Sequence, residues 1–157
     1  FLNEITNSYM SEVTILSGKE NMDVKAIHHF LSEESYWAKG ISFEFVDQSL
    51  ANSFCAGAFV NGKQVGFGRV ITDYYTFGWF ADFYVLPEYR GLKISKMLVS
   101  YIQKQPWAKR LRRKMLNTST AHGLYSQFGF TALNQPSYLM EEYKPGIHME
   151  YANSTME

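Results

Sequence analysis

The hydrophobic pattern of this chain changes its period from two to 3.6 residues at Pro87, and that change restricts the folds open to it. Before it, residues 77–86 alternate as a strand does; after it, apolar residues recur at helical spacing over 93–105. A short apolar stretch over 114–118 predicts a second strand. Strand, helix and strand in this order form a β-α-β unit with parallel strands, and ligands bind at the helix start of such units. The pattern therefore marks residues 86–95 as a candidate site.

Upstream of this unit, the clearest local signal is an Asn-Gly pair between two alternating apolar stretches. Asn61-Gly62 favours a type I′ turn and predicts a hairpin of strands over 53–60 and 64–72. The other expected elements are a strand over 12–16, a helix over 23–33, a loop with short helical pieces over 35–53, a helix capped within 118–120 that ends near 128, and final strands over 130–133 and 138–143. This order predicts a mixed α/β fold.

The length of 157 residues suits one compact domain. We expect residues 1–10 to be a leader or a remnant of cloning, because Met10 would make a natural start. We expect residues 11–143 to form the domain and residues 144–157 to be a loose tail.

Charge balance and cysteine content restrict which binding partners and which cellular compartment we expect for this protein. Fifteen basic and fifteen acidic residues cancel, so no overall field favours nucleic acid or an anionic membrane. No apolar stretch approaches the roughly 20 residues of a membrane helix, and the first residues do not resemble a secretory signal. The single cysteine, Cys55, excludes an intrachain disulfide and fits the cytoplasm. The four histidines lack metal-ligand spacing, so we expect no metal.

The turn that leads from the strand into the helix has the properties of an anion site. Backbone N–H groups at a helix start have no intrahelical acceptor, and the helix dipole adds partial positive charge there. Arg90, Lys93 and Lys96 place three cations around these groups. A pyrophosphate suits such a site.

The segment YVLPEYRGLKISKMLVSYI, residues 84–102, resembles the cofactor loop of the Gcn5-related N-acetyltransferases, whose signature is R/Q-x-x-G-x-G/A after a strand. The resemblance covers most of the chain, including the hairpin and the later segment LYSQFGF, and it is closest to small bacterial-type members with unassigned acceptors. It implies a mixed, mostly antiparallel sheet of six to seven strands flanked by helices. It also implies that acetyl-CoA is bound by the loop residues Tyr84, Val85, Arg90, Gly91, Leu92, Lys93, Ile94, Ser95 and Lys96.

Two positions of the loop depart from the signature. Lys93 stands where the family has its first glycine, and Ser95 stands where it has glycine or alanine. Ser95 is small and can contact a phosphate, whereas Lys93 restricts the positive φ and the close backbone approach that glycine allows. The loop is therefore either a working site with an added cation or a degenerate one.

Two residues are candidates for proton transfer. Tyr125 matches the family tyrosine near the cofactor sulfur, and a phenol can protonate the departing CoA thiolate; alternatively, its ring only packs in the core. Asp82 interrupts the apolar strand WFADFYV, where burial would raise the pKa of its carboxyl and suit it to accept a proton from an amine. It could instead be a structural carboxylate paired with Arg69.

The resemblance places the acceptor beside residues 35–47 and 73–77. These stretches combine aromatic side chains with carboxylates, which suits a cationic amine. The candidate contact residues are Tyr36, Trp37, Phe43, Asp73 and Tyr74. The sequence thus predicts transfer of an acetyl group from acetyl-CoA to a primary amine of a small molecule, by direct attack in a ternary complex. The assembly is left open, with a homodimer as one alternative. A protein or peptide acceptor and a non-catalytic CoA-binding domain are the alternatives.

Overall fold

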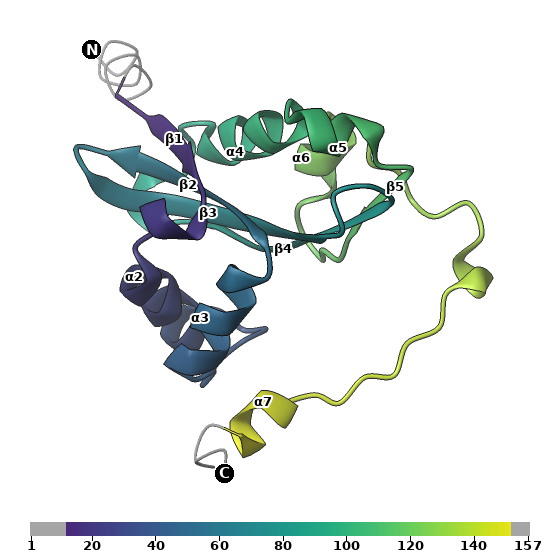
Figure 1. Cartoon of the computed structure of the whole chain (residues 1–157), viewed down its shortest axis with the longest axis horizontal. Coiled ribbons are helices and arrows are strands. Elements are labelled where there is room, and N and C mark those ends of the chain that lie inside the picture. The colour runs from purple at the N-terminus through teal and green to yellow at the C-terminus, as the bar shows by residue number, and fades with distance from the viewer. Residues whose placement is uncertain (1–11, 152–157) are drawn as a thin grey trace.

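A five-stranded sheet forms the centre of the fold (Figure 1). The computed structural model describes residues 12–151, so the leader expected at residues 1–10 lies outside the described part. The strands are β1 Thr14–Ser17, β2 Phe54–Val60, β3 Lys63–Thr72, β4 Phe77–Val85 and β5 Arg113–Leu116, and they lie in that order across the sheet. Neighbouring strands are antiparallel except β4 and β5, which are parallel.

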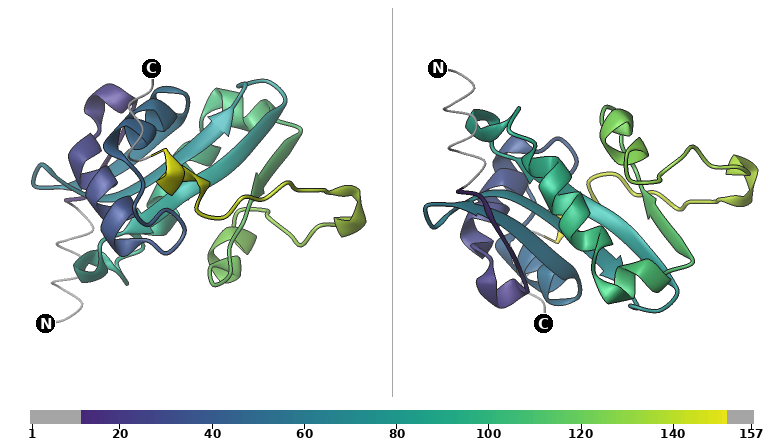
Figure 2. Two further views of the ribbon diagram at one scale, coloured as in Figure 1. Left: turned by 90° about the horizontal axis from the view of Figure 1, so that it is seen from below. Right: turned by 90° about the horizontal axis from the view of Figure 1, so that it is seen from above.

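Helices cover both faces of this sheet (Figures 1 and 2). One face carries α4 Ile94–Gln103 and α5 Pro106–Arg110, and the other carries α2 Val24–His29, its continuation η2 Phe30–Glu34, and α3 Phe43–Ala51. The shorter elements are η1 Lys19–Asn21, η3 Pro87–Tyr89, α6 His122–Ser126, η4 Pro136–Tyr138 and α7 Ile147–Glu150. Each face has its own core, with Leu98 and Ile102 of α4 buried on one side and Ile27 and Leu50 on the other.

The β-α-β unit and the hairpin are confirmed. β4, α4 and β5 follow one another, with Phe77 of β4 beside Arg113 of β5 in a parallel pairing. In the hairpin turn Asn61 and Gly62 both have positive φ, 48° and 78°, as a type I′ turn requires. Local turn chemistry and hydrophobic period thus determine this half of the fold.

The stretch 35–53 contains a longer helix than the sequence indicated. Ser42 caps α3, because its hydroxyl accepts a hydrogen bond from the Phe45 amide at 3.2 Å. Val46 and Leu50, one helical turn apart, are completely buried. Phe43 at the helix start is exposed, so the apolar residues of this stretch do not all mark the buried face.

The final strands expected over 130–133 and 138–143 were wrong, and the sheet of the described residues has five strands instead of six to seven. Residues 131–146, which we call the C-terminal arm, leave the sheet after α6 and lead to α7 (Figure 1). Every residue of the arm is exposed. Because no other strand of the described chain lies along the arm, its backbone has no partner with which to form a ladder.

The stretch expected as a loose tail, residues 144–157, includes the short helix α7. The imidazole Nε2 of His148 lies 2.9 Å from the carbonyl oxygen of Lys39, and the Met149 side chain packs against Gly40. These contacts hold the far end of the arm beside α3, on the face opposite α4 (Figure 1).

Candidate active site

A bulge in β4 places Asp82 in an unusual backbone conformation. In the pairing of β3 with β4, Gly68 faces two residues, Asp82 and Phe83, instead of one. Asp82 has φ 59°, a left-handed conformation that costs a residue with a side chain roughly 1–2 kcal/mol. The bulge also requires glycine at position 68, because the Phe83 ring occupies the space that a Cβ there would need. Such strain is typical of functional sites.

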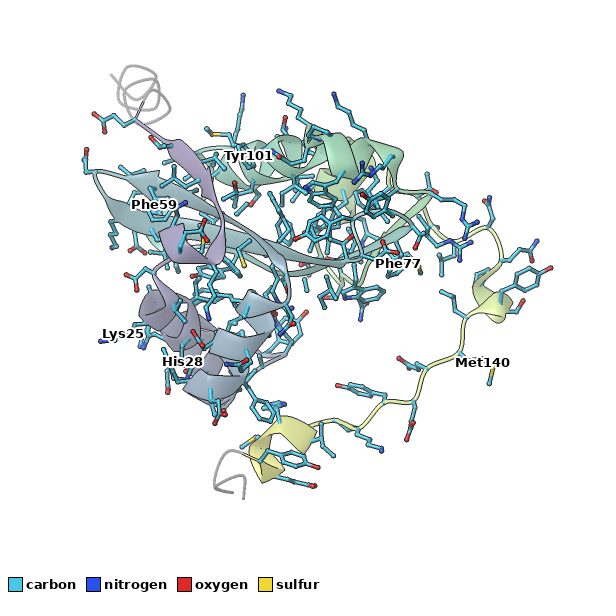
Figure 3. All side chains as sticks on the ribbon, viewed as in Figure 1. Lys25, His28, Phe59, Phe77, Tyr101 and Met140 are labelled. Carbon is cyan, nitrogen blue, oxygen red and sulfur yellow. The ribbon has the colours of Figure 1, made fainter. Side chains whose placement is uncertain are left out.

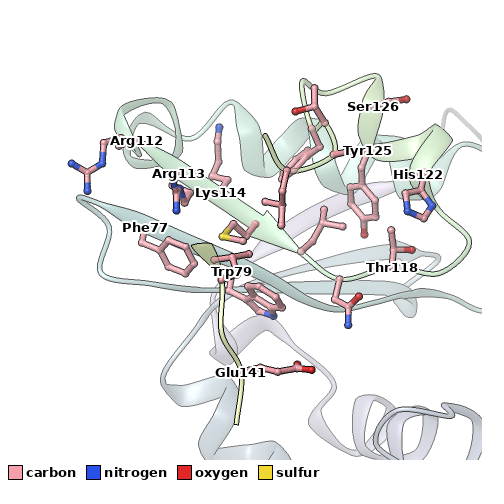
Figure 4. Close-up of a pocket in the computed structure, with 18 of the residues that line it drawn as sticks. Phe77, Trp79, Arg112, Arg113, Lys114, Thr118, His122, Tyr125, Ser126 and Glu141 are labelled. Atoms are coloured by element: carbon pink, nitrogen blue, oxygen red, sulfur yellow. The ribbon is translucent and has the colours of Figure 1, made fainter. Parts of the chain in front are cut away.

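The bulge lies where β4 and β5 diverge. β5 pairs only with Phe77 to Phe80 of β4. The second half of β4, from Ala81 to Val85, therefore has no strand partner on that side among the described residues. After Leu116 the chain leaves β5 and continues into α6, which faces this half of β4 (Figure 4).

The helix α6 positions Tyr125 at this divergence. The Tyr125 ring meets the rings of Phe83 and Phe130 edge to face, with centroids 6.1 and 5.7 Å apart, and only 7% of the residue is exposed. Its hydroxyl points from α6 toward the strands and has no hydrogen-bond partner among residues 12–151 (Figure 4). Burial raises the pKa of the Tyr125 phenol to about 12, so the group is protonated at neutral pH. The ring packs in the core, and the hydroxyl can still donate a proton.

Asp82 is the centre of a polar network on the other side of β4. Its Oδ2 accepts a hydrogen bond from Arg69 Nε at 2.6 Å, and its Oδ1 accepts one from Trp37 Nε1 at 2.9 Å. Arg69 also donates to the Ser53 hydroxyl at 2.8 Å. The structural pairing with Arg69 is therefore present, and both carboxylate oxygens of Asp82 already accept one hydrogen bond each.

The start of α4 has the unpaired amides that an anion site needs. Its first backbone hydrogen bond runs from the Met97 amide to the Lys93 carbonyl at 3.1 Å, and no side chain of the described residues caps the helix. The three amides that precede Met97 therefore lack an intrahelical acceptor. Gly91 has φ 80° and Lys93 has φ 61°, so Lys93 adopts the left-handed conformation for which glycine is the usual residue.

Side chains of the expected cofactor residues point in different directions. Arg90 is exposed, and its Nε donates to the Val85 carbonyl at 3.1 Å, which leaves the rest of the guanidinium free to contact an anion. The ring of Tyr84 stacks on Phe30 in the core, with centroids 3.8 Å apart, and burial raises the pKa of its phenol. Ile94 is also buried. Residues 84, 85 and 94 can therefore meet a cofactor chiefly through their backbone, whereas Arg90 and Lys93 can use their side chains.

The structure brings two of the expected acceptor residues to the divergence of β4 and β5. Trp37, which is 41% exposed, bonds to Asp82 as described above. Its neighbour Tyr36 extends its hydroxyl to 3.5 Å from Ser119 Oγ in the loop that precedes α6. The segment after η2 thus contacts both β4 and the α6 side, and its aromatic rings stand beside the bulge.

The other three expected acceptor residues lie elsewhere. Phe43 contacts the ring of His28 at the start of α3, with centroids 5.6 Å apart. The carboxylate of Asp73 accepts hydrogen bonds from the amides and hydroxyl of its own turn, which hold its pKa well below the usual range. Tyr74 packs on Trp107 of α5. This turn precedes β4, and five residues of strand, about 17 Å, separate its end from the bulge.

Comparisons with known proteins find acetyltransferases. The family model of the acetyltransferase (GNAT) domain matches residues 51–132. A solved structure described as a GNAT-family acetyltransferase from Xanthomonas campestris pv. campestris has a TM-score of 0.84 and is 43% identical, over 87% of this chain and 96% of that one. A curated relative from Gibberella zeae, named only as an acetyltransferase, is 30% identical over 127 residues, which are 68% of this chain and 71% of the relative.

The chain belongs to the GNAT acetyltransferase family. A protein of known structure from Staphylococcus aureus, 22% identical with a TM-score of 0.65 over 84% of this chain and 98% of that one, shares the fold. The matched residues 51–132 of this acetyltransferase include Asp82, Arg90 and Tyr125. They include neither Trp37 nor residues 133–146 of the C-terminal arm, so the acceptor side of the site lies largely outside the family match.

Beside β5 the acetyltransferase has a hollow of about 1330 Å³ that sequence reasoning missed. The start of β4, β5, α6 and the arm form its walls, and Trp79, His122 and Glu141 join Tyr125 in its lining (Figure 4). Trp79 alternates with Phe77 on the expected strand, which could have indicated a shared face. No sequence pattern indicated Glu141 as a lining residue, because residues 138–143 were expected to form a strand within the sheet.

Among residues 12–151, no helix combines the length and the apolar character needed to cross a membrane. The same residues bring no three metal-ligating side chains together.

Proposed function

We propose that this acetyltransferase moves the acetyl group of acetyl-CoA to a primary amine of a small molecule, by direct attack in a ternary complex. One observation carries the proposal: the protonated Tyr125 hydroxyl and the Asp82 network approach the same diverging half of β4 from opposite sides. The unpaired amides at the start of α4 come after the carboxyl end of that strand, with η3 and the turn at Gly91 between them. Donor site and acceptor site can therefore share one point of the sheet.

The proposed cofactor site consists of the start of α4 and its cations. The amides that precede Met97 would hold the pyrophosphate of acetyl-CoA, and Arg90 and Lys93 would add charge. The unpaired edge of β4 from Ala81 to Val85 offers backbone groups along which an extended pantetheine can lie. The co-substrate supplies the thioester, whose acetyl carbon the amine attacks.

We assign the proton transfers to Tyr125 and Asp82. The amine must lose its proton before it attacks, and Asp82 would accept that proton, directly or through water, in exchange for its bond to Trp37. As the C–N bond forms, the C–S bond breaks and the electron pair goes to sulfur. The Tyr125 hydroxyl then donates its proton to the CoA thiolate, so CoA leaves as a thiol.

The acceptor would lie against Tyr36 and Trp37. Two exposed aromatic rings beside a carboxylate suit an amine cation, because cation–π attraction and ion pairing act together. A peptide amine is the second candidate, and the observation in its favour is the open hollow of about 1330 Å³ that continues from Tyr125 along β5. We place the enzyme in the cytoplasm, since its buried Cys55 is unpaired, and we propose that it is a homodimer.

Calorimetry with acetyl-CoA and an amine panel test the proposal. Arg90→Glu should weaken acetyl-CoA binding at least tenfold, because it replaces a phosphate contact by a repulsive charge. Lys25→Glu, the same charge reversal on the exposed face of α2, should leave the affinity unchanged (Figure 3). The enzyme should release CoA in the presence of small primary amines. Equal affinity for Arg90→Glu and wild type would remove the α4 loop from the cofactor site, and turnover of peptides alone would favour the second candidate.

A further inference from the structure

The helices opposite α4 leave part of their sheet face exposed. The core that α2 and α3 form on this face reaches Phe67 in β3 and Tyr84 in β4. Beyond these residues, toward the turn that joins the two strands, Ile71 is 43% exposed and Phe77 is 37% exposed. Large apolar side chains that gather on a surface often mark a binding site, so this part of the sheet can hold a ligand.

Three apolar side chains form a row across this exposed part, which we call the apolar row. In the register of the sheet, Ile71 of β3 lies beside Trp79 of β4, and Trp79 lies beside Met115 of β5. Paired residues of neighbouring strands point to the same face. Val70 and Phe80, the sequence neighbours of Ile71 and Trp79, are buried in the core beneath α4. Because successive residues of a strand alternate between the two faces, the apolar row points away from α4.

The apolar row leads to the Asp82 carboxylate at one end. Arg69 precedes Ile71 by two residues in β3, so these two side chains share a face, and Arg69 donates to Asp82 on that face. Asp82 follows Trp79 by three residues in β4, which corresponds to roughly 7–10 Å of bulged strand. A molecule that lies on the apolar row can therefore place one of its groups at the carboxylate.

Arg113 lies at the other end of the apolar row. It pairs with Phe77, which precedes Trp79 by two residues. The next residue, Lys114, turns toward α4, where its Nζ donates to Gln103 Oε1 at 2.5 Å, so Arg113 points to the face of the apolar row. The exposed Arg113 guanidinium makes no hydrogen bond or ion pair with any of residues 12–151. It can therefore bind an anionic group of a ligand.

The hollow described above gives a ligand access to these groups. Phe77, Trp79 and Arg113 all belong to its lining (Figure 4). Its charged or titratable lining residues are Arg112, Arg113, Lys114, His122 and Glu141. Three basic side chains thus stand against one carboxylate, so this end of the hollow attracts an anionic group.

We propose that the acceptor is an elongated small molecule with a primary amine at one end, an anionic group at the other and an apolar body between them. The inference rests on the proposed acetyl transfer and names its substrate class. The amine would meet Asp82 and Trp37, the body would lie on the apolar row, and the anionic group would bind Arg113. Four residues of strand, about 13 Å, separate Phe77 beside Arg113 from the start of the bulge, so we expect a similar distance between amine and anion.

Three amines test the substrate class through the release of CoA thiol. The first is 11-aminoundecanoate, whose extended chain spans about the expected distance. The second is its primary amide, which has the same length without the charge, and the third is 4-aminobutyrate, which is too short to reach both ends. Wild type should acetylate the long acid with a kcat/KM at least about tenfold higher than that of either other amine, because only the long acid can meet both charged groups.

Two variants assign this preference to residues. Arg113→Gln should reduce the kcat/KM ratio of the long acid to its amide to about one, because it removes the cation that distinguishes them. Ile71→Ala should lower kcat/KM for both long amines at least about threefold, because it removes apolar contact area. Lys109→Gln is the matched control for the charge: Lys109 is exposed on α5 outside the lining of the hollow, and its removal should leave the ratio as in wild type.

The outcomes separate this inference from the proposed function. A long acid no better than its amide, or an Arg113→Gln enzyme that keeps the preference, would overturn the inference and leave the acetyl transfer intact. The same holds if the enzyme acetylates other primary amines but not the long acid. An enzyme that releases CoA with no amine at all would contradict the acetyl transfer itself, and the inference with it.

Discussion

Asp82, Gly91 and Lys93 have positive φ at 59°, 80° and 61°, and together they determine the backbone around the carboxyl end of β4. Asp82 produces the bulge, and the other two bend the chain into α4. Only one of the three is glycine, so the protein accepts backbone strain at two positions next to the proposed donor site. Strain of this size persists where the surrounding structure fixes it and the site uses the resulting geometry.

Lys93→Gly should stabilise the protein. Glycine removes the cost of the left-handed conformation, roughly 1–2 kcal/mol. It also gives the unfolded chain more entropy, which lowers the free energy of unfolding by about 0.4–1 kcal/mol. We therefore expect the free energy of unfolding in urea to rise by about 0.5–1 kcal/mol. Lys96→Gly is the matched control: it lies within α4, where glycine should cost about 1 kcal/mol. Equal destabilisation by both variants would show that position 93 does not need positive φ in solution.

At the scale of elements, the sequence predicted those helices, strands and turns whose conformation depends on residues close to them in the chain. The Asn61-Gly62 hairpin and the strand, helix and strand from β4 to β5 follow from local turn chemistry and period. The final strands did not form, because a strand needs a partner and the periodicity of residues 138–143 does not say where one lies. In the candidate site, Tyr125 and the loop were predictable from a motif. The Trp37 to Asp82 contact joins residues 45 positions apart, which no local pattern encodes.

Trp37→Ala should affect the acceptor much more than the cofactor. The variant removes an exposed ring and one hydrogen bond to Asp82, so we expect the KM of the amine to rise at least about tenfold while the KM of acetyl-CoA changes less than about threefold. Phe43→Ala removes a comparably exposed ring at the start of α3 and should change neither value much. A parallel rise of both KM values, or equal effects of the two variants, would place the acceptor elsewhere.

At the scale of the whole molecule, buried acidic groups link stability to alkaline pH. Burial raises the pKa of the Cys55 thiol from 9.0 to about 11 and that of the Tyr125 phenol to about 12, and it raises the pKa of Tyr84 as well. All three groups are neutral when protonated, so above pH 9 the folded protein holds more protons than the unfolded chain. The contribution of these three groups to stability is therefore constant below about pH 9 and is lost as pH rises from 9 to 12.

Urea unfolding at pH 8 and at about pH 10.5 measures this loss. Each unit of pKa difference corresponds to about 1.4 kcal/mol, so wild type should lose on the order of 2 kcal/mol over this interval. Cys55→Ala removes one of the three groups. Whatever its stability at pH 8, the free energy of unfolding of this variant should fall less between the two pH values than that of wild type. The same loss in both proteins would contradict a buried, protonated thiol.

The Tyr125→Phe variant tests the central claim most directly, through the amine-dependent release of CoA thiol. The variant keeps the ring between Phe83 and Phe130 and removes only the hydroxyl, so its stability and its affinity for acetyl-CoA should stay close to those of wild type. Loss of a general acid typically costs about 10²–10⁴ in rate, and we expect kcat to fall at least tenfold. Tyr101→Phe, which removes a hydroxyl bonded to Ser17 of β1 at the opposite edge of the sheet from β5, should leave kcat unchanged. A Tyr125→Phe enzyme that turns over as fast as wild type would contradict the proposed site.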